Sequence, residues 1–491
     1  MRVMEHMDSR AGEYSLATDT IVLPNAHEFT RQGMDPRFTG TNLGIWRDVG
    51  SVFADLAVFW GGDDKLVISP RPIPQEYIEY VRDHFNISGL FTCSPRTYSS
   101  MFCRDILADS ALMDDLVVKY QWAPSVRLHT WGATEDTYLL IDSLAGRGVC
   151  IEALDIPRRP DFWSSLYLDS KAGFRLLCTE LRQADARISM PQGFICDSLH
   201  DALETSHYFH GRDMGCVLKA NMGVSGLGIL VLGPEWSDQP KKALETFVFR
   251  QIRDLPYFRQ GPIIVERHMR GLDLYRGSRL QYGSVFFNAY VSADKQVEIF
   301  GGGRELRNGD NFYVGALLGK GGVPVDIERT ITPIMQQLCE AAMSYDYCGH
   351  IGVDFLIDES GTPLLLELNP RRCGESHVYD LASRLYGPTW SSSKTALTRL
   401  PVYVEMIGDW QLTGVLEAFE RVNQRHRGDG VLVVPTCVSW LHLVPPGLGY
   451  VVFGSDNEAI AVAETALLEL LDREGIRGQG SGLASLAQTP Q

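Results

Sequence analysis

The 491-residue sequence contains no apolar run long enough to cross a bilayer. Its most apolar stretch, residues 52–60, is short and includes Asp55, whereas a membrane-spanning helix needs about 20 consecutive apolar residues. The first 14 residues are polar and mixed in charge, without the apolar segment of a signal peptide. These absences predict a soluble, cytoplasmic protein with no membrane partner.

Basic residues are in deficit, and no cysteine pair has metal-site spacing. The chain has 45 Lys and Arg against 61 Asp and Glu, a formal charge of −16. Binding a nucleic-acid backbone requires clustered Lys and Arg, so we expect no nucleic-acid partner.

The ten cysteines include no CxxC pair, which leaves a structural zinc site or a thioredoxin-like redox motif without support.

The remaining composition is that of a folded, multidomain protein. Hydrophobic residues make up 45% of the chain and charged residues 22%, near the globular average. The length predicts about three domains. Four blocks follow from the pattern: an α/β domain at 1–165, a strand-rich body at 166–400, a small α+β appendage at 401–475, and a Gly-, Ser- and Gln-rich tail at 476–491 that we expect to be disordered.

Strand and helix patterns alternate in the first block. Strands are expected at 66–69 and 149–154, and helices at 76–84 and 134–146. This alternation predicts a parallel sheet. In the body, strands are expected at 215–219, 228–232, 262–266, 282–291, 296–301, 351–357 and 363–368, with a helix at 332–345. In the appendage, we expect helices at 410–425 and 457–474 and strands at 430–435, 438–444 and 450–453.

The strongest chemical signal is an acidic hairpin. Asp354 begins one predicted strand, Glu367 follows 13 residues later near the end of the next, and Asn369 comes two residues after it. Antiparallel partners meet at these positions. Two carboxylates and an amide oxygen suit Mg²⁺, although acids that point to solvent from an alternating strand would give a similar pattern.

A glycine-rich loop follows the strand that ends near Lys219. Its small residues are Gly223, Ser225, Gly226 and Gly228, which allow backbone N–H groups to approach phosphate oxygens. It is neither a Walker loop, because the lysine precedes the glycines, nor a Rossmann turn, because a strand follows. A flexible turn would look the same.

The third signal is an apolar strand that ends in Glu266. Asp273 follows seven residues later. Such a strand end offers backbone groups and one carboxylate to an adenine, and a second carboxylate to ribose hydroxyls. A strand end with solvated acids gives the same pattern.

In this order and spacing, the three signals resemble the ATP-grasp superfamily of carboxylate–amine ligases over about residues 135–390. More narrowly, the N-terminal block, the run from Glu367 to His377 and the C-terminal block look like the pre-ATP-grasp peptide ligases of bacterial natural-product biosynthesis, of the pheganomycin type. The resemblance implies an N-terminal pre-ATP-grasp α/β domain, a two-lobed ATP-grasp body (lid lobe about 175–265, metal-site lobe about 266–400) and the α+β appendage.

The resemblance also implies roles for individual residues. Lys171, at a helix start, and Lys219 would bind the phosphates of ATP, and residues 223–228 would close over them. Glu266, with the backbone of Arg267 and His268, would face adenine. Asp273 would take the ribose, and Asp354, Glu367 and Asn369 would hold two magnesium ions.

In such an enzyme a substrate carboxylate becomes an acylphosphate that an amine, such as an amino acid or peptide, then attacks. Arg371 is our first candidate for binding the γ-phosphate or the carboxylate, and Arg304 is the second, because a guanidinium fork matches paired oxygens. His377 and His350 are candidates for amine deprotonation, with a structural histidine as the alternative. A kinase or carboxylase with a non-amine acceptor, a non-catalytic nucleotide-binding module and a homodimeric assembly stay open.

Overall fold

The computed structural model describes residues 19–34, 43–223, 228–253, 255–259, 261–272, 281–307 and 313–478. Ser225, Gly226 and Asp273 lie outside these described residues. No helix within them is long and apolar enough to cross a membrane.

The N-terminal domain is built on a parallel five-stranded sheet, as the alternating pattern predicts. Its strands run in the order β3-β2-β1-β4-β5 and every pair is parallel. Residues of β1 and β2 are buried along their whole length, which explains the apolar runs at 21–23 and 66–68. The strands are β1 (Thr20–Leu23), β2 (Lys65–Ile68), β3 (Leu90–Cys93), β4 (Val126–Thr130) and β5 (Ile151–Ala153).

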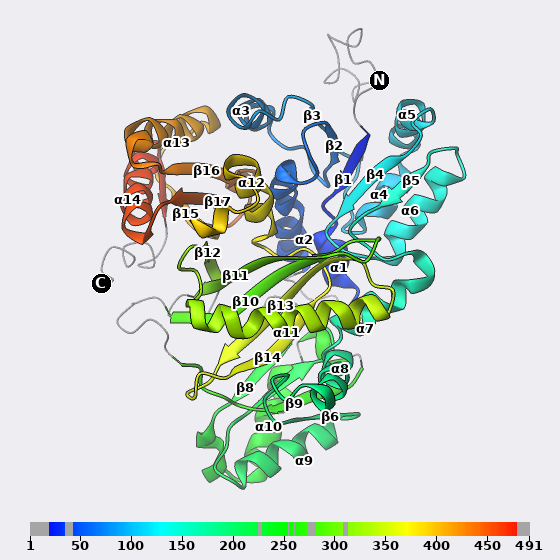
Figure 1. The fold of residues 1–491 in the computed structure, drawn as a ribbon, viewed down its shortest axis with the longest axis vertical. Coiled ribbons are helices and arrows are strands. Elements are labelled where there is room, and N and C mark those ends of the chain that lie inside the picture. The colour runs from blue at the N-terminus through cyan, green and yellow to red at the C-terminus, as the bar shows by residue number, and fades with distance from the viewer. Residues whose placement is uncertain are drawn as a thin grey trace.

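Helices flank this sheet (Figure 1). Thr134 caps one of them, because its side-chain oxygen accepts a hydrogen bond from the Thr137 backbone nitrogen at 3.0 Å. The helices are α1 (Ala26–Arg31), α2 (Leu43–Val52), α3 (Gln75–Phe85), α4 (Phe102–Ala108), α5 (Ser110–Tyr120) and α6 (Glu135–Ala145).

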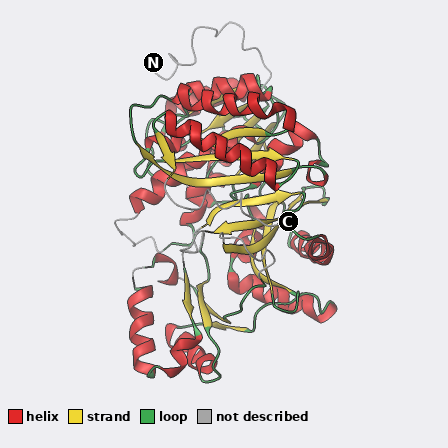
Figure 2. Ribbon diagram, turned by 90° about the vertical axis from the view of Figure 1, so that its left-hand side faces the viewer, coloured by secondary structure: helices red, strands yellow, loops and turns green. Residues whose placement is uncertain are grey.

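The lid lobe is a separate antiparallel sheet that projects from the rest of the molecule (Figure 2). Helices α7 (Phe162–Asp169) and α8 (Lys171–Ala184) lead into it. Its strands have the order β6-β9-β7-β8, and helices α9 (Leu199–His210) and α10 (Lys241–Ile252) pack on it. The strands are β6 (Gly193–Cys196), β7 (Cys216–Ala220), β8 (Ile229–Leu232) and β9 (Ile263–Arg267).

The central sheet carries the acidic hairpin at its edge. Its strand order is β14-β13-β10-β11-β12-β15-β17-β16, and α11 (Val325–Ser344) covers one face with an apolar layer. The first five strands along this order are β14 (Pro363–Asn369), β13 (Gly349–Ile357), β10 (Gln281–Val291), β11 (Val297–Arg307) and β12 (Tyr313–Gly319).

The C-terminal strands extend this same sheet. Strand β15 (Thr395–Met406) pairs with β12 through Leu317↔Leu397 and its neighbours, so the expected boundary at 400/401 falls inside a strand. Helix α12 (Ser376–Tyr386) precedes it. The remaining elements are α13 (Leu412–His426), β16 (Leu432–Cys437), β17 (Gly447–Gly454), α14 (Asn457–Arg473) and β18 (Ile476–Gly478).

Two local predictions in this region are wrong. Residues 438–444 are not a strand: a 3₁₀ turn forms at Ser439–His442, because Asp55 accepts hydrogen bonds from both the backbone nitrogen and the hydroxyl of Ser439 at 2.7 Å. The tail expected to be disordered from 476 begins with strand β18, since Ile476 is buried and pairs with Met406.

Asp55 connects the N-terminal domain to the C-terminal strands. It is 1% exposed, and burial raises its pKa from 3.8 to about 7. Between about pH 4 and pH 7 the folded carboxyl therefore holds a proton that the unfolded chain has released. The stability contributed by this proton is complete at the acidic end and is lost as the pH rises through 7.

We predict that Asp55→Asn removes this pH dependence. As the pH rises from 5 to 8, the free energy of unfolding of the wild type should fall relative to that of the variant, by on the order of a few kcal/mol. Urea unfolding followed by tryptophan fluorescence measures both. Asp409→Asn, at an exposed carboxylate, is the control. A wild-type-to-variant difference that stays constant over this pH range would contradict the assignment.

Candidate functional site

The acidic hairpin forms as predicted and brings its three polar residues together. Asp354 and Glu367 are directly opposite one another on β13 and β14. The Asn369 side-chain nitrogen lies 3.5 Å from Asp354 Oδ2. The turn between the strands is fixed by Asp358, whose Oδ1 accepts hydrogen bonds from the backbone nitrogens of Ser360 and Thr362 at 2.9 Å.

The carboxylates of this hairpin repel one another and their neighbours. Burial raises the pKa of Asp354 well above its usual value, and the negative charges of Glu305, Glu367 and Glu375 raise it further. Glu305 lies on β11 and Glu375 directly precedes α12. Asn288 Nδ2 donates to Glu375 Oε1 at 2.8 Å. Sequence reasoning missed both glutamates, although Glu375 follows Arg371 by only four residues.

Lys171 reaches this cluster from the base of the lid lobe. Ser170 caps α8 by accepting a hydrogen bond from the Gly173 nitrogen at 3.0 Å, which places Lys171 at the first helical position. The Lys171 Nζ lies 3.0 Å from Glu367 Oε1. Asn221 also binds this helix start, since its backbone and side-chain oxygens accept from the Lys171 and Ala172 nitrogens.

Lys219 belongs to a second buried ion cluster, on the lid lobe. Its Nζ lies 2.6 Å from Glu266 Oε2 and 3.4 Å from the Leu366 carbonyl. Arg175 binds the other oxygen of Glu266. The Glu266 carboxylate, which we expected to face adenine, therefore binds the lysine and the arginine. These two cations offset the burial of Glu266 and lower its pKa.

The backbone at the end of β9 is already hydrogen bonded. The Arg267 nitrogen donates to the Gln192 carbonyl at 2.7 Å, and the His268 nitrogen donates to the Gly215 carbonyl at 2.8 Å. Their N–H groups are thus used within the lid lobe.

The glycine-rich loop connects β7 and β8. The Ala220 nitrogen donates to the Gly228 carbonyl at 2.7 Å, and Gly228 has a φ of +89°, a backbone conformation that favours glycine. Gly223 continues the segment that carries Lys219 and Asn221. The loop therefore starts beside both lysines, while the sequence positions between Gly223 and Gly228 lie outside the described residues.

Arg371 lies at the end of the hairpin, as predicted. Its Nη2 donates to Asn369 Oδ1 at 2.7 Å. Its guanidinium carbon lies 5.6 Å from the ring centre of Phe29 and 6.0 Å from that of Trp131. Both aromatic residues follow strands of the N-terminal sheet, β1 and β4. The strand order reverses between these two strands, where open α/β sheets commonly place their ligands.

Arg304 directly precedes Glu305 on β11, so the two side chains leave the sheet on opposite faces. Successive residues of a strand point to opposite faces of the sheet, and Glu305 is the neighbour whose charge acts on Asp354. Arg304 pairs with Val285 and Leu317 on the adjacent strands. It therefore points to the other face.

The two histidine candidates are poor proton acceptors. Burial lowers the pKa of His377 to about 3, and burial together with the charge of Arg372 does the same for His350. An imidazole with so low a pKa removes a proton from an amine only weakly. Neither side chain has the basicity that the sequence-based hypothesis required.

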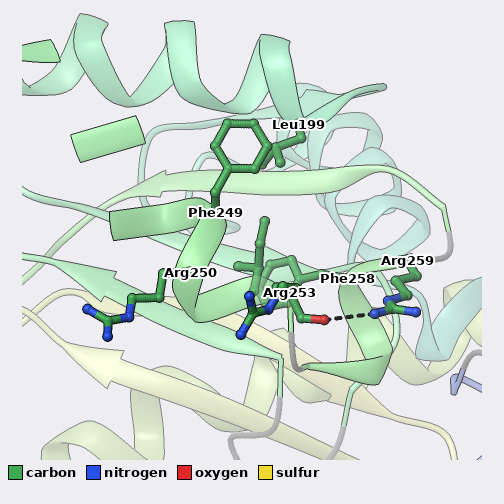
Figure 3. A pocket seen from close by; sticks show the side chains of 7 residues that line it. Leu199, Phe249, Arg250, Arg253, Phe258 and Arg259 are labelled. Carbon is green, nitrogen blue, oxygen red and sulfur yellow. Dashed lines mark hydrogen bonds between the residues drawn. The ribbon is translucent and has the colours of Figure 1, made fainter. Parts of the chain in front are cut away.

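A cavity of about 430 Å³ in the lid lobe is lined by none of these residues (Figure 3). Its described lining is Leu199, Phe249, Arg250, Ile252, Arg253, Phe258 and Arg259. Arg259 donates to the Arg253 carbonyl at 2.8 Å. None of these residues was predicted for the site.

The hairpin fits a divalent cation. Within the described part of the chain, no three His, Cys, Asp or Glu side chains form a metal site by themselves. The predicted set instead combines two carboxylates with the amide of Asn369, whose Nδ2 faces Asp354 and whose Oδ1 accepts a hydrogen bond from Arg371. A cation placed there would relieve the repulsion that raises the pKa of Asp354, and carboxylate and amide oxygens are the donors that Mg²⁺ accepts.

No protein-family model matches the chain, and no curated protein sequence does. Solved structures do match. Those with a TM-score above 0.5 include a biotin carboxylase from Campylobacter jejuni in a β-γ-ATP complex (TM-score 0.56, 12% identity, 96% of this chain and 94% of that chain). A second is the biotin carboxylase domain dimer of the Hydrogenobacter thermophilus 2-oxoglutarate carboxylase with MgADP, ADP and bicarbonate (0.52, 10%, 96% and 93%).

A third is an N5-carboxyaminoimidazole ribonucleotide synthetase in complex with ADP (TM-score 0.51, 11% identity, 94% of this chain and 98% of that chain). The likeness extends over almost the whole of each chain. It therefore includes the N-terminal parallel sheet and the C-terminal strands as well as the body between them. This chain shares the fold of these three enzymes.

Proposed function

We propose that this protein is an ADP-forming ligase that uses ATP and Mg²⁺ to activate a carboxylate and join it to an amine. One observation carries the proposal. Two buried lysines from the lid side, Lys171 and Lys219, meet the hairpin that holds Asp354, Glu367 and Asn369. Cations and carboxylates are thus gathered at one place, as a polyphosphate with its metal requires.

Each group in this arrangement has a role toward ATP. Lys171 and Lys219 would bind phosphate oxygens, and the loop between Gly223 and Gly228 would close over them. Asp354, Glu367 and Asn369 would hold Mg²⁺, which neutralises charge on the transferred phosphoryl group. Arg371, fixed through Asn369, would direct its guanidinium fork at the γ-phosphate or at the substrate carboxylate.

The reaction requires positioning rather than a protein nucleophile. An oxygen of the substrate carboxylate attacks the γ-phosphorus, and ADP leaves. The amine then attacks the acylphosphate carbonyl, phosphate leaves, and the amine loses a proton. Holding the carboxylate against the γ-phosphate, and then the amine against the acylphosphate, supplies much of the rate enhancement.

The identity of the carboxylate separates two candidate reactions. The motif resemblance favours an amino acid or a peptide, and thus peptide-bond formation in natural-product biosynthesis. The whole-chain likeness to two biotin carboxylases and a carboxyaminoimidazole synthetase favours bicarbonate as a second candidate. In that case the product would be an N-carboxylated amine.

We predict that Glu367→Gln weakens divalent-metal binding by about tenfold or more in the presence of ADP, because one anionic oxygen donor is lost. Electron paramagnetic resonance of Mn²⁺ measures the free ion directly. Glu359→Gln, at an exposed position of the same hairpin's turn, is the matched control and should bind like the wild type. Equal metal affinity for both variants would place the metal elsewhere.

We further predict that ADP release requires both a carboxylate and an amine. The purified protein is incubated with Mg·ATP, pools of amino acids and dipeptides, and ¹³C-bicarbonate, and products are read by mass spectrometry. A product equal to two substrates minus water identifies the amide ligase, whereas a ¹³C-carboxylated amine identifies the carboxylase. ADP release with a phosphorylated acceptor and no need for an amine would contradict the ligase assignment.

A further inference from the structure

Arg372 directly follows Arg371, but the carboxylates that its side chain binds are Asp155 and Asp380, not those of the hairpin. Its side chain is buried between the N-terminal domain and α12. Nη2 and Nε lie 3.3 and 3.4 Å from Asp155 Oδ2, and Nη1 lies 2.8 Å from Asp380 Oδ2. The guanidinium carbon is 4.6 Å from the ring centre of Trp60. Each of its three guanidinium nitrogens thus faces a carboxylate oxygen of Asp155 or Asp380.

Asp155 is held equally firmly on the N-terminal side. It follows β5, and its Oδ2 also accepts from His129 Nδ1 at 3.0 Å and the Thr130 nitrogen at 3.2 Å. His350 of β13 lies 3.7 Å from its other oxygen. Burial alone would raise the pKa of Asp155, but Arg372 and His129 hold it well below the usual range. The carboxylate is therefore a charged anchor on the N-terminal domain.

A short chain of contacts runs from this anchor to the site. The Arg372 nitrogen donates to the Trp131 carbonyl at 2.8 Å. The Arg372 carbonyl accepts from Arg371 Nη1 at 3.0 Å, and Arg371 Nη2 donates to Asn369 Oδ1 at 2.7 Å. The position of Arg372 thus sets where the Arg371 guanidinium lies, and Arg371 orients Asn369.

A buried ion pair by itself would indicate only a structural role. Arg399 and Glu464, in the C-terminal strands and α14, form such a pair with N–O distances of 2.7 and 3.2 Å and equally low exposure. Arg399 has no place in the site we describe. What distinguishes Arg372 is its direct connection to the residues that would meet the γ-phosphate and the metal.

We propose that Arg372 is a positioning residue: its ion pair with Asp155 docks the N-terminal domain against residues 369–372 and thereby fixes Arg371 and Asn369 for phosphoryl transfer. This inference rests on the proposed ATP-dependent function of the site. It assigns a role to a residue that the sequence pattern left without one.

The test compares Arg372→Gln, Arg372→Lys and Asp155→Asn with the matched control Arg399→Gln in the full-length protein, at a temperature where each is folded by circular dichroism. Using the substrates that the wild type accepts, we expect kcat to fall about 10- to 100-fold in Arg372→Gln, since small misplacements of reacting groups have effects of this size. The KM for ATP should change less than about threefold, because the lysines that bind its phosphates are untouched. Arg372→Lys should recover part of kcat, and Arg399→Gln should keep wild-type kcat.

A second comparison separates positioning from general destabilisation. Because Arg372 acts through Arg371, adding Arg372→Gln to Arg371→Gln should lower kcat no further. A further multiplicative loss in the double variant, or equal kcat for Arg372→Gln and Arg399→Gln, would overturn the proposal. If Arg372→Gln does not fold, Asp155→Asn carries the same comparison. A wild type that does not bind Mg·ATP would instead contradict the proposed function itself.

Discussion

The repulsion among the partly buried carboxylates in and around one hairpin is the constraint on which the rest of this site depends. Asp354 and Glu367 face one another across paired strands, and Glu305 and Glu375 add their charges to the same region. Burying several like charges is costly unless cations compensate. The chain therefore surrounds the hairpin with cations drawn from three different parts of the fold.

Each cation arrives by a different structural route. Lys171 is placed by the capped start of α8, which Asn221 of the glycine-rich segment also binds. Lys219 comes from the lid sheet, where Glu266 holds its Nζ. Arg371 follows the hairpin itself and lies against aromatic rings of the N-terminal domain. A single site thus depends on the relative positions of the lid lobe, the central sheet and the N-terminal domain.

Sequence alone was sufficient where the relevant contacts are local. The acidic hairpin could be predicted because 13 residues separate Asp354 and Glu367 and a turn lies between them. The contact of Lys171 with Glu367 joins residues 196 apart in sequence, and only the family resemblance pointed to that lysine. Glu305 and Glu375 were missed because nothing in a single sequence shows that β11 and the start of α12 meet the hairpin.

The errors have the same physical origin. Residues 438–444 have the composition of a strand, but a buried hydrogen bond to the distant Asp55 turns the backbone. Nothing in the sequence indicated that β15 extends the central sheet, because its pairing with β12 is a long-range contact that no local pattern encodes. His377 was a candidate by its position in the chain. Its basicity depends on how deeply it is buried, and that depends on how α12 packs against the rest of the fold.

The most direct test of the account is a crystal structure of the protein with Mn²⁺ and ADP, in which anomalous scattering locates the metal. We expect the manganese peak among Asp354, Glu367 and Asn369, with the diphosphate bound by Lys171 and Lys219. Manganese or ADP bound elsewhere, for example ADP in the arginine-lined cavity of the lid lobe, with the hairpin carboxylates uncontacted, would contradict it.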